Sequence, residues 1–213
     1  MNERYYSELL LAYLRAATGE TACQDLDSLM AAAKAQEIKY YDFKRSQPLL
    51  PRVKMVLGFL KALQFNTLLD VGSGRGAFLW PFMDAFTDVE TYSVDLLPHR
   101  IDVLQKVRNG GISRLHPMLG DVRQLDFDDC SMDVVTLLEV LEHIPDVEGA
   151  VRNAVRIAKQ CVIVSVPSKP DDNPEHIHLL TKDKLMALFG DAGCAKLNFS
   201  GVPGHLILVA SKG

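Results

Sequence analysis

The first 64 residues carry apolar side chains that recur three and four positions apart, the spacing of one face of an α-helix. This pattern predicts three helices. Gly19 is expected to end the first helix, and the connector "YYDFKRSQPLLP" separates the second from the third. The apolar positions are Tyr6, Leu9, Leu10, Tyr13 and Leu14, then Leu26, Leu29, Met30 and Ala33, then Val53, Val56, Leu57, Leu60 and Leu63.

From residue 67 the pattern changes to short apolar runs that alternate with helical spacing. This alternation implies right-handed crossovers and a mostly parallel sheet covered on both faces. Two final apolar runs are separated by only "GVPG", which is too short for a helical crossover, so they are expected to pair antiparallel. The expected strands are 67–71, 91–95, 132–140, 161–167, 196–200 and 205–211, and the expected helices are 77–86, 98–111, 150–158 and 181–193.

The stretch "LLDVGSGRGAFLW", residues 68–80, places three glycines between a predicted strand and a predicted helix. Glycine lets the backbone approach a ligand closely, and a helix N-terminus offers free N–H groups. Gly72, Gly74 and Ala77 fit the dinucleotide fingerprint G-x-G-x-x-G/A. A purely structural turn has the same appearance, so the fingerprint needs support from other residues.

Two acidic residues give that support. Asp95 ends the second predicted strand, where a carboxylate can accept hydrogen bonds from both ribose hydroxyls. Asp121 lies where a third strand should end, so its side chain can take an adenine amino group while the N–H of Val122 serves a ring nitrogen. The structural alternatives are a helix cap or a solvated strand end for Asp95 and a turn aspartate for Asp121.

Four motifs, "LLDVGSGRGAF", "YSVD", "GDVRQLDF" and "VVTLLEVLEHIPD", occur in an order and spacing that resembles the class I S-adenosylmethionine-dependent methyltransferases over residues 67–211. The resemblance implies a Rossmann-like α/β fold, a mostly parallel seven-stranded sheet with an antiparallel last strand, and S-adenosylmethionine as cofactor. We therefore expect a helical cap at residues 1–64 and a cofactor-binding domain at residues 65–213. The expected cofactor-binding residues are Asp70, Gly72, Ser73, Gly74 and Gly76 at the methionine end, Asp95 and Leu96 at the ribose, Asp121 and Val122 at the adenine, and Glu139 near the sulfonium.

The composition and the charge limit the kinds of partner and the cellular compartment that we expect for the protein. The net charge of −4 argues against a general nucleic-acid-binding surface. The four cysteines form no C-x-x-C pair, and neither a signal peptide nor an apolar run of membrane-spanning length is visible. We therefore expect a cytoplasmic protein that methylates a small-molecule acceptor, with no membrane or nucleic-acid partner. Two alternative functions remain. A dinucleotide dehydrogenase would explain the glycine fingerprint but not the other motifs, and a cofactor-binding protein without catalysis would have all four motifs.

The stretch "EVLEHIPD" contains the candidate catalytic residues. A phenol, thiol or amine acceptor benefits from a base that removes its proton, and Glu142 and His143 are the candidates for this role. If the chain turns helically after the strand, Glu139, Glu142 and His143 share one face, and His176 and His178 should reach the same rim. The structural alternative is that these histidines only stabilise their own loops.

The same residues allow a metal site. "E-x-x-E-H" with a later histidine resembles ubiquinone-biosynthesis O-methyltransferases and small-RNA 3′-terminal methyltransferases, and in the latter branch two glutamates and two histidines hold a divalent ion. By this resemblance Glu139, Glu142, His143 and His176 would bind Mg, Mn or Zn. The chain has no basic tract for RNA, and we favour a polar, metal-free role at the substrate pocket.

The apolar stripes of residues 1–64 must pack against the rest of the chain. We expect these helices to lie across the carboxyl edge of the sheet and to wall off the substrate. Tyr40, Tyr41 and Lys44, in the connector, are the candidate substrate contacts.

Overall fold

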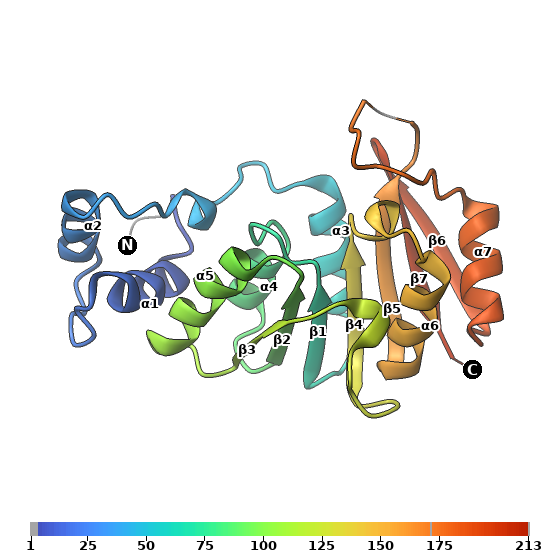
Figure 1. Ribbon diagram of the computed structural model, residues 1–213, viewed down its shortest axis with the longest axis horizontal. Helices are drawn as coiled ribbons and strands as arrows, with labels where there is room; N and C mark the ends of the chain where they lie inside the picture. Colours follow the sequence, from blue (N-terminus) through green and yellow to red (C-terminus); the bar gives the residue numbers. More distant parts are fainter. Residues whose placement is uncertain (1–3, 171, 213) are drawn as a thin grey trace.

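A single seven-stranded sheet runs through the computed structural model, which describes residues 4–170 and 172–212 (Figure 1). The strand order is β3-β2-β1-β4-β5-β7-β6, and β7 is antiparallel to both of its neighbours. The Rossmann-like architecture and the final antiparallel pairing are therefore confirmed. The strands are β1 Thr67–Val71, β2 Glu90–Asp95, β3 Leu115–Leu119, β4 Met132–Leu138, β5 Ala158–Pro167, β6 Lys196–Val202 and β7 His205–Ser211.

The helices follow the predicted spacing. The αL conformation of Gly19 ends the first helix, and the side chain of Thr181 caps the last one, as expected. The α-helices are α1 Ser7–Thr18, α2 Leu26–Ala35, α3 Pro51–Leu60, α4 Leu79–Ala85, α5 Pro98–Asn109, α6 Val147–Ile157 and α7 Lys182–Asp191, and the short 3₁₀ turns are η1 Tyr41–Phe43, η2 Val122–Gln124 and η3 Leu141–His143.

Several predicted boundaries shift by one to three residues in the structure, and two of the shifts occur next to backbone with positive φ. The helix expected to begin at residue 77 begins at Leu79, because the turn that contains Gly76, whose φ is +80°, continues to Phe78. The strand expected to reach residue 140 ends at Leu138, because Glu139 has a φ of +60°. Left-handed backbone cannot continue a strand.

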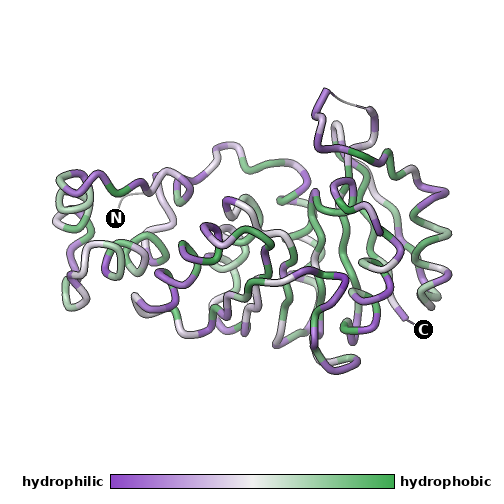
Figure 2. The backbone as a smooth tube through the Cα atoms, in the orientation of Figure 1, coloured by the Kyte–Doolittle hydropathy of each residue, from purple (hydrophilic) through white to green (hydrophobic). Residues whose placement is uncertain are grey.

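Alternate strand residues form two hydrophobic clusters, one on each face of the sheet. Leu68 and Val134 pack with α1 to α5, whereas Leu69 and Val135 pack with α6 and α7. Figure 2 shows the central strands as mainly hydrophobic and the loop between β5 and α7 as mainly hydrophilic. No helix in the described part of the chain has the length and apolar character that crossing a membrane requires.

The N-terminal helices pack differently from our expectation. Helix α1 packs against α5, and α2 packs against α1, so both lie beside the sheet rather than across its carboxyl edge (Figure 1). Among the described residues before β1, the connector between α2 and α3 and the first turn of α3 reach that edge. The η1 turn of the connector buries Phe43, whose ring stacks on that of Trp80 with 4.8 Å between the centroids. The cap and the sheet therefore share one hydrophobic cluster.

Candidate active site

The glycine turn after β1 is held by the neighbouring strand β2. The N–H of Gly72 donates to the carbonyl of Val94 at 2.7 Å, and the N–H of Gly74 donates to Oδ2 of Asp95 at 3.0 Å. Gly74 has a φ of +54°, and a Cβ placed on it would meet no heavy atom closer than 3.9 Å. The space beside this glycine is thus open to a ligand, whereas the side chain of any other residue would partly fill that space.

A cavity of about 640 Å³ opens beside this turn at the carboxyl edge of the sheet. We call it the cofactor cavity. Eight of the residues predicted for the site line it, and they come from the ends of β1, β2, β3 and β4. These residues are Gly72, Gly74, Asp95, Leu96, Asp121, Val122, Glu139 and His143. The sequence motifs therefore converge on one cavity of the size that small-molecule sites usually have.

Asp70, Ser73, Gly76 and Glu142 do not line that cavity, and Asp70 shows what such a residue does instead. Its buried carboxylate accepts hydrogen bonds from Ser73 Oγ and Thr136 Oγ1, each at 2.7 Å. Burial raises the pKa of Asp70 to about 6. The two hydrogen bonds act in the opposite direction and lower the pKa, while the neighbouring charge of Asp95 raises it further. Asp70 thus braces the turn from behind.

Asp95 also has a structural role. Its Oδ1 accepts from the N–H of Leu97 at 2.9 Å, in addition to the bond from Gly74. The carboxylate therefore joins the glycine turn to the start of α5. A carboxylate has about four acceptor positions, so two remain for ribose hydroxyls.

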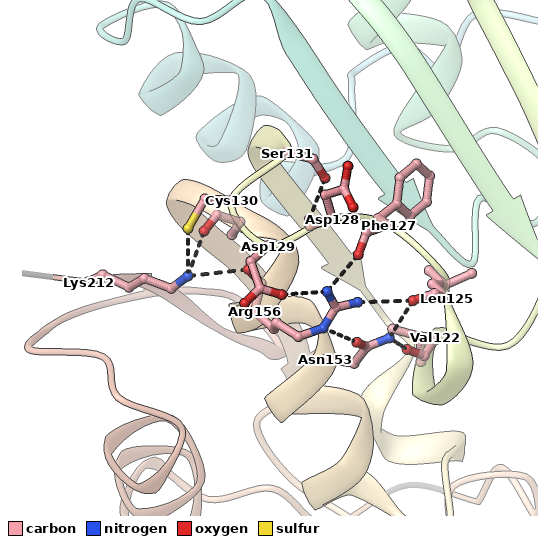
Figure 3. Close-up of polar contacts among 11 residues, drawn as sticks. Val122, Leu125, Phe127, Asp128, Asp129, Cys130, Ser131, Asn153, Arg156 and Lys212 are labelled. Carbon is pink, nitrogen blue, oxygen red and sulfur yellow. Dashed lines mark hydrogen bonds and ion pairs between the residues drawn. The ribbon is translucent and has the colours of Figure 1, made fainter.

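At the far end of the cavity, Asp121 and Val122 are held by side chains that the sequence analysis did not single out. The Arg123 side chain pairs with the carboxylate of Asp121 and lowers its pKa. Asn153 Nδ2, on α6, donates to the carbonyl of Val122 at 2.6 Å, and Arg156 binds the carbonyls that follow in the same loop (Figure 3). Helix α6 therefore fixes the backbone of this loop.

Glu139 does not share a face with Glu142 and His143, which corrects our expectation. The left-handed backbone at Glu139 turns its carboxylate toward Ser165 Oγ at 2.6 Å and His205 Nε2 at 3.0 Å. Arg52 Nε, on α3, lies 3.9 Å from the same carboxylate. Non-glycine residues in this backbone region are uncommon and are concentrated at functional sites.

Glu142, His143 and His176 do come together. One possible ligand atom from each residue lies within 4.8 Å of the others, and the two histidine rings meet edge to face. Glu142 is fully buried, and the Nδ1 of His143 lies 3.0 Å from the carbonyl of Glu175. His178 lies outside this group, with its Nε2 3.4 Å from the carbonyl of Pro145. Three of the four residues of the metal hypothesis are thus adjacent, and Glu139 is not among them.

The candidate substrate contacts in the connector divide into two groups. Tyr41 and Lys44 line a second cavity, which borders the glycine turn at Arg75. Tyr40 instead packs edge to face against Tyr5, with 5.8 Å between the ring centroids.

Residues 69–164 match a family model described as a methyltransferase domain. A sterol 24-C-methyltransferase from Aspergillus fumigatus is 30% identical over 117 residues, which make up 51% of this chain and 31% of that protein. The chain thus spans about a third of the length of this curated relative.

Solved structures share the fold at low sequence identity. Magnesium protoporphyrin IX methyltransferase from Synechocystis, with bound SAH, has a TM-score of 0.62 and 18% identity, over 76% of this chain and 82% of that one. The YcgJ protein of Bacillus subtilis has a TM-score of 0.61 and 15% identity, over 76% and 98% of the two chains. The cyclase SpnF has a TM-score of 0.62 and 15% identity, over 76% and 79%. Because a cyclase shares the fold, the reaction must be argued from the site.

Proposed function

Residues 69–164 belong to the class I S-adenosylmethionine-dependent methyltransferases, and from this premise we propose that the chain transfers a methyl group from S-adenosylmethionine to a small-molecule acceptor. The observation that carries the proposal is the cofactor cavity, in which an open glycine turn and an acidic strand end face one space. When bound, the cofactor supplies an activated methyl group on a positively charged sulfur.

The lining of the cavity suggests how the cofactor lies. Gly72 and Gly74 would face the methionine part, and Asp95 and Leu96 the ribose. The loop at Asp121 and Val122 would take the adenine, through the backbone that Asn153 and Arg156 fix (Figure 3). Asp70, Ser73 and Gly76 would act from behind by holding the turn in place.

The chain's main contribution to the reaction would be position. Holding two reactants in line replaces much of the entropy cost of their meeting. His143 is the side chain best placed to act as base, because it lines the cavity whereas Glu142 is fully buried. A carbonyl only accepts, so the Nδ1 that faces Glu175 carries the proton of the neutral ring, and Nε2 is its basic nitrogen.

Calorimetry with S-adenosylhomocysteine and with NAD tests the cofactor assignment. We expect the wild-type protein to bind S-adenosylhomocysteine and not NAD. Asp95→Asn keeps only one of the two acceptor oxygens that face the N–H groups of Gly74 and Leu97, and it removes the charge offered to the ribose, so S-adenosylhomocysteine should bind more weakly by about 1.5 to 3 kcal/mol. Equal affinity in the variant and the wild type, at equal thermal stability, would refute the ribose assignment.

A metal-dependent methyltransferase is the second candidate, favoured by the cluster of Glu142, His143 and His176. A carboxylate and two imidazoles make a reasonable set for Zn or Mn, which would supply Lewis acidity or hold an acceptor oxygen. Glu139 does not complete the set, because its carboxylate faces Ser165 and His205.

Chelation separates the two candidates. For a metal-free base, His143→Ala should lower the rate by about 100- to 10,000-fold, and EDTA should change nothing. For a metal site, EDTA should abolish turnover, and His176→Ala should be as damaging as His143→Ala. His178→Ala is the control, because this histidine lies outside the cluster. If His143→Ala changes only thermal stability, neither role applies.

A further inference from the structure

A second cavity, of about 690 Å³, lies between the N-terminal segment and the glycine turn. We call it the connector cavity. Its walls come from Arg4 and Tyr6, from connector residues between 41 and 48, and from residues between 75 and 81, where the glycine turn leads into α4. Because Arg75 and Gly76 belong to the turn whose Gly72 and Gly74 line the cofactor cavity, the two cavities are neighbours along one loop.

The connector cavity is lined by four basic side chains and one acidic one, in a chain whose net charge is −4. The acidic residue, Asp42, already faces Arg100 at 3.6 Å, and Arg45 is paired with Asp84 at 2.7 Å. The remaining cations are Arg4, Lys44 and Arg75, and none of them forms an ion pair with any residue of the described ranges 4–170 and 172–212.

Three cations gathered in a concave site repel one another and raise the local positive potential, which an anionic ligand would relieve. Two buried aromatic residues, Tyr6 and Trp80, also line the cavity. Trp80 Nε1 donates to the carbonyl of Arg75 at 2.9 Å and fixes the backbone from which this arginine projects. The cavity therefore offers positive charge beside apolar surface.

We propose that the connector cavity holds an anionic group, a carboxylate or a phosphate, of the methyl acceptor. This inference rests on the proposed function and names the substrate class for it. The Asp42–Arg100 pair supports the link, because Asp42 lines the connector cavity while Arg100 lines the cofactor cavity. An acceptor anchored by Arg4, Lys44 and Arg75 would be held next to the turn that faces the methionine part of the cofactor.

The single tryptophan of the chain makes the site measurable, because Trp80 lines this cavity. Inorganic pyrophosphate and citrate are titrated at constant ionic strength into protein saturated with S-adenosylhomocysteine, and tryptophan fluorescence is followed. We expect a saturable change whose dissociation constant rises about tenfold in Arg75→Gln and in Lys44→Gln. Lys34→Gln, an exposed lysine of α2 outside the cavity, should bind like the wild type. No saturable change, or equal binding in all variants, would overturn the proposal.

The same variants distinguish the acceptor's anion from the carboxylate of the cofactor. Calorimetry compares S-adenosylhomocysteine with methylthioadenosine, which has the nucleoside but no carboxylate. We expect Arg75→Gln and Lys44→Gln to leave both affinities unchanged. If they weaken only S-adenosylhomocysteine, the cations serve the cofactor and the proposal is wrong. If the wild type binds no S-adenosylhomocysteine, the proposed function fails, and the anion titration on the protein alone still tests the cavity.

Discussion

At the scale of single residues, the sequence identifies the groups but not the direction in which each one points. Gly74, Asp95 and Val122 line the cofactor cavity as expected, because the ends of parallel strands meet at one edge. The buried carboxylate of Asp70 instead faces Thr136, and the carboxylate of Glu139 faces Ser165 and His205. A residue's type shows what it can bind, whereas its direction depends on local backbone angles that leave no periodic signal.

His205 shows what the sequence analysis missed at this scale. It is the first residue of the antiparallel strand β7, which therefore starts at the carboxyl edge of the parallel strands. Its position next to Glu139 follows from the hairpin that the sequence predicted, so a search for polar residues at that strand start would have found it. Arg52 reaches the same carboxylate from α3, and no sequence pattern indicates that contact.

Asp70 gives a prediction about pH. Its pKa rises from 3.8 to about 6 in the folded protein, because burial disfavours the charged form. Between these values the folded state holds a proton that the unfolded state has lost, so the contribution of Asp70 to stability falls as pH rises through about 6. Asp70→Asn should therefore be more stable than wild type at about pH 7, by at most about 3 kcal/mol, and should lose this advantage at about pH 4. Denaturant unfolding at both pH values measures the difference, and an equal gap at both would contradict the assignment.

At the scale of elements, the hydrophobic spacing is sufficient to predict most helices and strands. The hairpin of β6 and β7 follows from a connection too short for a helix, and the crossover strands follow from alternation. Among the shifted boundaries, the late start of α4 follows Gly76 and the early end of β4 precedes Glu139, and both of these residues have positive φ. The packing of one helix against another is harder to predict from the sequence. The close approach of α1 to α5, for example, depends on a single glycine.

Gly110 is this glycine, and it yields a prediction about the α1–α5 contact. A Cβ placed on Gly110 would lie 1.7 Å from the carbonyl oxygen of Ala12, so the two elements must separate to admit it. Gly110→Ala should reduce the free energy of unfolding by about 1 to 3 kcal/mol. Gly190→Ala, in α7, is the matched control: its Cβ would meet nothing within 4 Å, and it should stabilise the protein by up to about 1 kcal/mol. Thermal unfolding of the two variants measures both effects, and a neutral Gly110→Ala would mean that α1 does not pack so closely.

At the scale of the whole molecule, the sequence predicts a two-faced sheet with a helical N-terminal segment but not where that segment packs. The spacing of apolar residues identifies the face of a helix that must be buried. It does not identify the surface that covers this face, because many apolar surfaces could do so. Here α1 lies against α5, and the described parts of the segment that border the glycine turn are the connector and the stretch at Arg4 and Tyr6. The segment at residues 1–64 is thus expected to contribute walls of the connector cavity, while none of its described residues, 4–64, lines the cofactor cavity.

The shared core predicts that the cap and the sheet unfold together. Leu14 on α1 is fully buried in the same cluster as Leu68 of β1 and the ring of Phe43, which stacks on Trp80. Leu14→Ala should therefore lower the stability of the whole chain by about 2 to 5 kcal/mol. Tryptophan fluorescence and far-ultraviolet circular dichroism should report the same single transition in denaturant.

The exposed Glu8→Gln on the same helix should shift neither signal. Affinity for S-adenosylhomocysteine should be unchanged in folded Leu14→Ala, because the helix does not touch the cofactor cavity. Two separate transitions, with only the earlier one moved by Leu14→Ala, would instead show that residues 1–64 form an independent folding unit.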